Sequence, residues 1–271
     1  MRNLSPRPVI AHKWTSLLLA TTALSVGALG VGMAEARMVP PVAAQDQTVW
    51  LAQSEGGEGG EAGAVAGVDG DTAYLVRLAI VEGHLIAAGN LYKAGLVDDA
   101  IGLSYHPEAE MMDEVRATLV AHGREDFTQL MQAFSTEMEN GAADVQPALM
   151  TFQAAVGTAI EAEAPDASVR FKVAVAVLRA AAAEYAGSIE GGVVTDVLAY
   201  HEAQAFVAVA RDVLGGIAGD AALVRLAERA QAAMDPAAAA FGAVKGGFVA
   251  NDPAILLGVA ARVELISSQV R

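Results

Sequence analysis

The chain has 271 residues, a formal net charge of −15 and no cysteine. Without thiols it forms no disulfide framework, thiolate zinc site or iron–sulfur cluster. Its negative charge repels polyanions, so nucleic acid and anionic membrane surfaces are poor partners. A metal ion or a cationic protein of the cell envelope is a better partner, although net acidity by itself also keeps a protein soluble.

The first 36 residues are typical of a secretory signal peptide. A basic start precedes an uncharged stretch over 15–34, and Ala34-Glu35-Ala36 supplies a small-x-small cleavage pattern. A second cleavage pattern lies at Val42-Ala43-Ala44. An uncleaved anchor is the alternative, because the stretch is about long enough to span a bilayer. Cleavage is favoured, and it predicts a periplasmic or otherwise exported protein with no membrane span.

Residues 37–70 differ in composition from the rest of the chain and are rich in Gly, Glu, Pro and Gln. Glycine loses much backbone entropy on folding, and acidic segments with little apolar surface do not build a core. This stretch therefore predicts a flexible acidic tether between the leader and a folded domain over 71–271.

Residues 71–271 predict an all-α antiparallel bundle or array of about nine helical segments, because alanine-rich runs alternate with Gly, Pro and Asp punctuation. The expected segments cover about 71–94, 98–106, 107–123, 124–139, 147–164, 166–188, 193–213 and 220–234, followed by a short helix that starts at Asp235-Pro236 and a last helix that starts at Asn251-Asp252-Pro253.

His84 and the pair His106 and Glu110 are the first candidate ligands. His84 lies in a segment that is apolar nearly all round, so we expect it to be buried, where both ring nitrogens need partners. A metal ion would satisfy one nitrogen, and so would a carbonyl or carboxylate. His106 and Glu110 stand four residues apart across Pro107, a spacing that also suits a simple helix start.

A second group of candidates lies on the helices predicted on either side of Gly191-Gly192. His201 and Glu202 are neighbours, and adjacent helical residues diverge by about 100°, so only one of them faces the bundle interior. If the two helices pack antiparallel, Glu184 lies roughly level with them. Carboxylates and imidazoles in one layer are how helical bundles build metal sites.

Several motifs are missing. Positions three before the histidines beyond the leader hold no glutamate, so the Glu-x-x-His signature of di-iron bundles is absent; the residues are Val81, Leu103, Leu119 and Leu198. HExxH, GxSxG and GxxxxGK[ST] are also absent, which disfavours protease, hydrolase and nucleotidase functions.

The exported helical layout with Gly83-His84 on an early helix resembles the imelysin-like and iron-uptake periplasmic proteins. Those helical bundles carry a His-x-x-Glu motif and are linked to metal acquisition. Ala87 stands where the Glu of that motif would be, so the resemblance implies metal handling without that ligand.

Two functions are compatible with these residues. The first is a non-enzymatic binding protein for a divalent transition metal such as Fe, Cu or Zn, with haem as another cargo. Its ligands would be His84, His106, Glu110, Glu184, His201 and Glu202. The second is an envelope interaction or assembly protein in which the histidines are structural. Convergence of two of the histidines with a carboxylate would favour the first.

Overall fold

The computed structural model describes residues 58–243 and 247–270, which fall within one compact unit, Trp50–Arg271. The predicted signal peptide and residues 37–57 of the predicted tether lie outside the described residues. The all-α prediction is confirmed, since helices dominate the described ranges. They are α1 (Glu58–Ala66), α2 (Gly70–Lys93), α3 (Val97–Ser104), α4 (His106–Glu110), α5 (Met112–Ala121), α6 (Thr128–Glu139), α7 (Gln146–Ala162), α8 (Ala167–Gly187), α9 (Val197–Gly215), α10 (Ala221–Ala233), the 3₁₀ helix η1 (Asp235–Ala240) and α11 (Ala254–Ser267).

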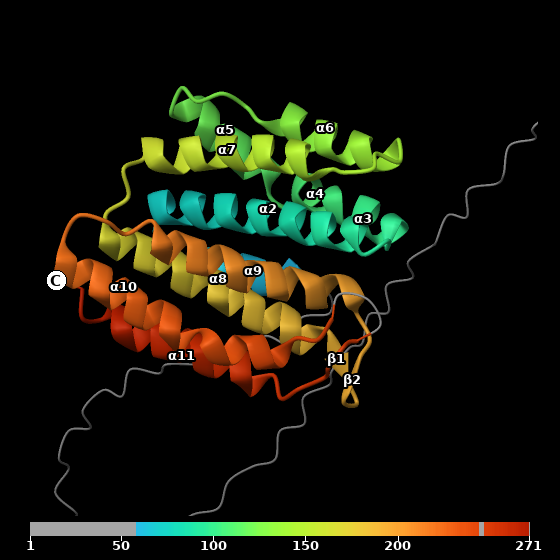
Figure 1. The fold of residues 1–271 in the computed structure, drawn as a ribbon. Coiled ribbons are helices and arrows are strands. Elements are labelled where there is room, and N and C mark those ends of the chain that lie inside the picture. The colour runs from blue at the N-terminus through green and yellow to red at the C-terminus, as the bar shows by residue number, and fades with distance from the viewer. Residues whose placement is uncertain (1–57, 244–246, 271) are drawn as a thin grey trace, which may run out of the picture. The chain divides into compact units, whose positions relative to one another are not determined.

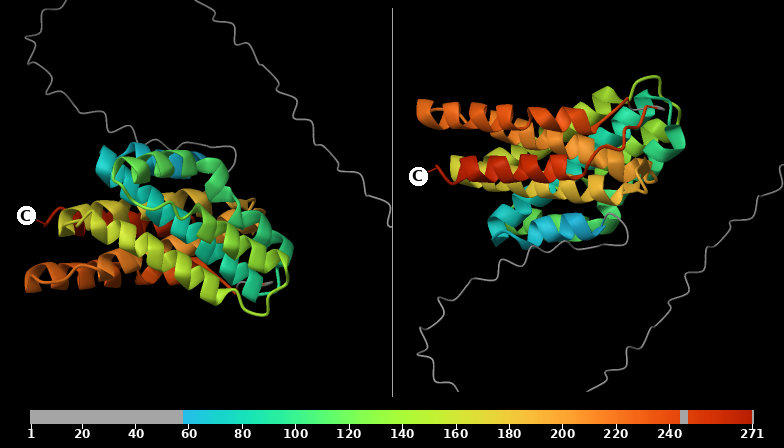
Figure 2. Two further views of the ribbon diagram at one scale, coloured as in Figure 1. Left: turned by 90° about the horizontal axis from the view of Figure 1, so that it is seen from above. Right: turned by 90° about the horizontal axis from the view of Figure 1, so that it is seen from below.

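The helices of this unit are arranged around α2. Figure 1 shows α2 between α7 on one side and the pair α8 and α9 on the other, with α10 and α11 beyond that pair. A short hairpin of β1 (Ile189–Glu190) and β2 (Val193–Val194) joins α8 to α9. The two views of Figure 2 place α1 on the flank of the bundle, where it packs on α8 and α2.

The central helix α2 is buried along most of its length. The Asp69 side chain accepts a hydrogen bond from the Thr72 amide at 3.1 Å and so starts the helix, and Gly95, with φ of 80°, follows its end. α2 is long and apolar enough to cross a membrane, but 78% of its most apolar window is buried inside the bundle. Its apolar surface is therefore that of a core helix.

Helix α1 corrects part of the tether prediction. Residues 58–66 form a helix that packs on α8, and Glu61 and Ala64 are buried there. Gly60 explains the close packing, since a Cβ atom at this position would lie 2.6 Å from the Cβ of Ala183. The glycine predicted to make this segment flexible instead allows two helices to approach each other.

Three predicted boundaries also need correction. The helix expected from Arg124 begins at Thr128, whose amide donates a hydrogen bond to the Asp126 side chain at 2.8 Å. The helix expected over 107–123 is two helices, because Met111, with φ of −147°, leaves the helical region between α4 and α5. The helix expected from Val193 begins at Val197. Gly191 and Gly192, with φ of 59° and 80°, make the turn of the hairpin, which places Val193 in β2.

Candidate metal centre

Six ionisable side chains converge in the interior between α1, α2, α4, α8 and α9. We call this set the His–Glu cluster; it consists of Glu61, His84, His106, Glu110, Glu184 and Glu202. Two imidazoles thus share one site with four carboxylates. Five of the six residues were predicted from the sequence as candidate ligands, and as metal ligands they remain a prediction.

His84 is held in one orientation at the centre of the cluster. Its Nδ1 lies 2.9 Å from the carbonyl oxygen of Ile80, and a carbonyl only accepts hydrogen bonds, so Nδ1 carries a proton. In the neutral imidazole the lone pair is then on Nε2. A metal-binding histidine is typically fixed in this way, with its second nitrogen donating to a carbonyl or carboxylate.

The free end of the His84 ring faces three carboxylates. Its Nε2 lies 3.2 Å from Oε1 of Glu61, 3.3 Å from Oε2 of Glu110 and 3.3 Å from Oε1 of Glu202. Two donors each ~2.1 Å from one ion, at octahedral or tetrahedral angles, lie ~3.0–3.4 Å apart. Each carboxylate oxygen is thus at a spacing from Nε2 that two ligands of one ion can have, and ligand atoms of His84, His106 and Glu110 lie within 4.8 Å of one another, close enough to hold a metal ion.

His106 extends the cluster toward the surface. Its Nδ1 lies 3.3 Å from Oε1 of Glu202 and 3.8 Å from Oε1 of Glu110, which is four residues away on α4. The His106 side chain is 36% exposed and that of Glu110 is 19% exposed, whereas Glu61, His84 and Glu202 are at most 6% exposed. The short helix α4 is thus the solvent side of the cluster.

Glu184 is the most buried carboxylate of the cluster. It is 1% exposed, and neither of its oxygens has a hydrogen-bond partner among the described residues. Burial, reinforced by the negative charges of Glu202 and Glu61, raises its pKa to about 9. Carboxylates buried without donors are costly unless something else compensates their charge.

The other buried groups also have shifted protonation equilibria. Burial raises the pKa of Glu61 to about 7. Burial alone lowers the pKa of His84, but the attraction of Glu61, Glu110 and Glu202 outweighs it and raises that pKa to about 10. The hydrogen bond to Glu202 raises the pKa of His106 as well. Without an ion, protons bound to this site offset its negative charge.

Close packing of α2 on α9 positions the inner ligands. A Cβ atom at Gly83 would overlap the ring of Phe206 on α9, so only glycine permits this approach. The Phe206 ring then packs edge-on against the His84 ring, with centroids 5.4 Å apart. Gly83 thereby brings His84 within reach of Glu202.

The cluster as defined above does not include His201, and its role as a ligand stays a prediction. The His201 ring packs against Tyr200 and Phe248 at centroid distances of 5.4 and 5.7 Å. Its neighbour Glu202 faces the cluster. Adjacent side chains on a helix point about 100° apart, yet His201 and Glu202 are both buried, at 2% and 5% exposed, so the expectation that only one of them faces the interior is wrong.

Glu61 is the cluster residue that sequence reasoning missed. It lies in a segment interpreted as a flexible tether, so its side chain was not considered as a ligand. Ala64 and Val65, at i+3 and i+4 from Glu61, are the signal that indicates a helix face, since both pack in or against the core.

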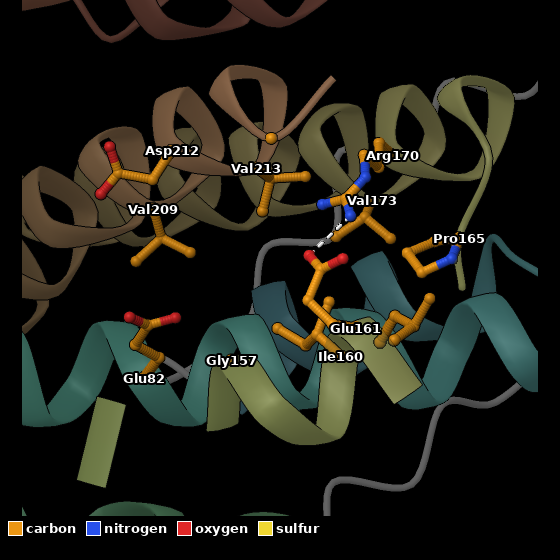
Figure 3. A pocket seen from close by; sticks show the side chains of 12 residues that line it. Glu82, Gly157, Ile160, Glu161, Pro165, Arg170, Val173, Val209, Asp212 and Val213 are labelled. Atoms are coloured by element: carbon orange, nitrogen blue, oxygen red, sulfur yellow. Dashed lines mark hydrogen bonds and ion pairs between the residues drawn. The ribbon is translucent and has the colours of Figure 1, made fainter. Parts of the chain in front are cut away.

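A separate pocket of about 180 Å³ lies between α2, α7, α8 and α9. Figure 3 shows Glu82 and Asp212 at one end and the ion pair of Arg170 with Glu161 at the other, across walls of Val, Ile and Pro. The pocket contains none of the six cluster residues. We base the functional argument on the cluster because its donors are buried and converge, whereas this pocket is mostly apolar.

Residues 160–255 match the family model of the iron permease-associated 4-helix bundle domain. No curated protein and no solved structure matches the chain. The matched range runs from the end of α7 into α11 and contains Glu184 and Glu202, but not the cluster residues on α1, α2 and α4. The match supports an iron-uptake-related helical bundle; it does not extend to the imelysin-like family.

Proposed function

We propose that this chain is an exported, non-enzymatic protein that binds a divalent transition-metal ion, iron foremost, in the His–Glu cluster. One observation carries the proposal. Nε2 of His84 faces three carboxylate oxygens at 3.2–3.3 Å, while its Nδ1 is fixed by the Ile80 carbonyl. When an ion displaces the Nε2 proton, the imidazole lone pair and the negative oxygens are available to it in a buried site.

The donor set favours certain cargoes. Imidazole and carboxylate donors suit Fe, Mn and Zn, whereas copper(I) selects sulfur ligands. Met111 and Met112 are buried core residues. The spacing of the donors suits a bare ion rather than haem. Similarity to an iron permease-associated domain adds weight to iron.

An envelope assembly role with purely structural histidines accounts less well for the site. His201 fits that description, since it packs among aromatic rings. A purely structural role does not explain why four carboxylates gather around His84, because a structural imidazole needs only one acceptor for each N–H. The excess of buried negative groups favours a cation.

The test is calorimetric titration of the full chain, without a histidine tag, with Fe²⁺ under anaerobic conditions. The Glu202→Gln variant keeps the side-chain volume and removes the negative oxygen that lies 3.3 Å from both imidazoles. We expect the affinity to fall by at least ~10–100-fold. Glu163→Gln is the matched control, because Glu163 pairs with His122 at 3.1 Å outside the cluster. Absence of binding by the parent, or equal binding by Glu202→Gln, contradicts the proposal.

A further inference from the structure

We infer that the His–Glu cluster holds two divalent cations that share bridging carboxylates, one on Nε2 of His84 and one on Nδ1 of His106. This inference rests on the proposed metal-binding function and adds the number of ions and their positions. The inner ion would be held by His84, Glu61 and Glu184. The outer ion would be held by His106, with Glu110 and Glu202 shared between the two.

Glu110 carries the geometric argument. Its Oε2 lies 3.3 Å from Nε2 of His84, and its Oε1 lies 3.8 Å from Nδ1 of His106. The two oxygens of one carboxylate are thus directed at two different imidazoles. A carboxylate that bridges two ions ~3.5–4 Å apart presents its oxygens in this way, one to each ion.

Glu202 lies between the two imidazoles as well. Its Oε1 is 3.3 Å from Nε2 of His84 and 3.3 Å from Nδ1 of His106. The two rings are inclined by 64° with centroids 6.2 Å apart, so their lone pairs reach the shared carboxylates from different directions. Glu110 and Glu202 therefore lie between the two imidazoles. Ligand atoms of His84, His106 and Glu110 lie within 4.8 Å of one another, and we assign one ion to each imidazole, with the two carboxylates bridging them.

The charge of the site is compatible with two ions. Four ionised carboxylates carry four negative charges, and two neutral imidazoles carry none. One divalent ion balances two of these charges and leaves the other two to protons, whereas two ions balance the site after its protons have been displaced. The oxygens of Glu184 and Oε2 of Glu61 are buried without a hydrogen-bond partner among the described residues. These carboxylate oxygens are therefore available to bind the inner ion.

The helices supply the donors differently from the Glu-x-x-His pattern. Four carboxylates and two imidazoles are the donor set of di-iron carboxylate bundles, in which two helices each supply a Glu-x-x-His pair. Here His84 comes from α2 alone, and α4 supplies His106 and Glu110 four residues apart. The absence of the Glu-x-x-His motif therefore does not exclude a dinuclear site.

The experiment counts ions. The full chain, without a histidine tag, is dialysed against Mn²⁺, an air-stable probe with similar ligand preferences, and bound metal is measured by atomic absorption. We expect two ions per parent chain and one in His106→Ala, a substitution at a half-exposed side chain. His122→Ala is the matched control, because that imidazole is also half-exposed and paired with a glutamate, and it should retain two ions.

The electron paramagnetic resonance spectrum tests whether the ions are bridged. Two bridged Mn²⁺ ions couple magnetically, so the six-line signal of an isolated ion should be lost in the loaded parent and return in His106→Ala. One ion per parent chain overturns the dinuclear inference and leaves the proposed function intact. Two ions in His106→Ala, or two uncoupled ions in the parent, also overturn it. Absence of any binding instead removes the proposed function itself.

Discussion

Two imidazole–carboxylate sites in this molecule differ in how their charges are balanced. At the surface, His122 lies 3.1 Å from Glu163, and Arg124 contacts the same carboxylate at 3.3 Å. The single carboxylate at that site, Glu163, thus pairs with two cationic or hydrogen-bond-donating side chains. In the His–Glu cluster, four carboxylates face two imidazoles, and several carboxylate oxygens are buried without a hydrogen-bond donor in the part of the chain that the structure describes. The same residue types thus form a complete ion pair in one place and an incomplete site in the other.

The protonation equilibria of the two sites shift in opposite directions. The hydrogen bond from His122 lowers the pKa of Glu163, because the donors stabilise its charged form. Burial raises the pKa of Glu61 and of Glu184, because their charged forms lack sufficient donors. An excess of buried acceptors over donors is therefore the feature that distinguishes a candidate binding site from a structural ion pair.

The largest expected effect is stabilisation by metal. A ligand that binds only the folded state at ~1,000 times its Kd stabilises by ~4 kcal/mol, which for a domain of this size raises the unfolding midpoint by roughly 8–16 °C. We expect this shift when excess Mn²⁺ replaces a chelator, measured by circular dichroism at 222 nm. Glu202→Gln should lose most of the shift and Glu163→Gln should retain it. A shift that survives in Glu202→Gln would place the ion outside the cluster.

The next effect is a gain of stability when the innermost carboxylate is removed. Glu184→Met keeps a side chain of similar length in the core and removes two oxygens that lack hydrogen-bond partners among the described residues. In the presence of a chelator at pH 8 we expect it to stabilise the chain by ~1–3 kcal/mol, measured by urea unfolding, because an unsatisfied buried polar group costs about that much. The same variant should bind metal more weakly. A loss of stability would show that Glu184 already has its partners.

The pH dependence of stability should change sign when metal is added. The pKa values of Glu61, His84 and Glu184 in the folded chain, about 7, 10 and 9, are raised above the ordinary values of 4.5, 6.5 and 4.5. Groups with raised pKa values stabilise the fold at low pH, and that contribution is lost as the pH rises toward the folded-state pKa. Between pH 6 and 8.5 the metal-free chain should therefore become less stable, by up to ~1.4 kcal/mol per pH unit for each proton released on unfolding.

Metal reverses this trend because the ion competes with those protons, so its affinity rises with pH. Unfolding midpoints measured at several pH values with chelator and with Mn²⁺ should move in opposite directions. Parallel curves would contradict the assignment of the ion to these groups.

The sequence alone was sufficient for the helical class and for much of the cluster. A histidine in an apolar helix had to be buried, and His106 and Glu110 had to lie near each other whether or not α4 and α5 were one helix. The sequence could not show that Glu202 is the side chain of α9 that faces the cluster. This orientation depends on the rotation of α9 about its axis, which is set by long-range packing such as that of Gly83 on Phe206.

Glu61 was missed for a different physical reason. Glycine raises the entropy cost of ordering a segment, and that cost supports a flexible tether unless packing offsets it. Gly60 and Ala183 provide that packing, because small residues let α1 lie close to α8. Composition describes the cost but not the partner surface, which is formed by residues more than one hundred positions away.

The smallest effect is expected at the surface site, and its signs should be opposite to those of the cluster. Glu163→Gln should cost less than ~1 kcal/mol, since partly exposed ion pairs contribute little. Because the pKa of Glu163 is lowered below 4.5, its contribution is present at neutral pH and is lost as the pH falls through that folded-state pKa. Salt should also weaken it, because exposed charges are screened at high ionic strength. Urea unfolding of the parent and of Glu163→Gln at pH 7 and pH 3, at low and high salt, measures the cost and its dependence on pH and on salt. The stability gained in Glu184→Met should be nearly insensitive to salt, because it comes from burial rather than from exposed charge. Equal salt dependence of the two variants would mean that the contrast between the two sites is wrong.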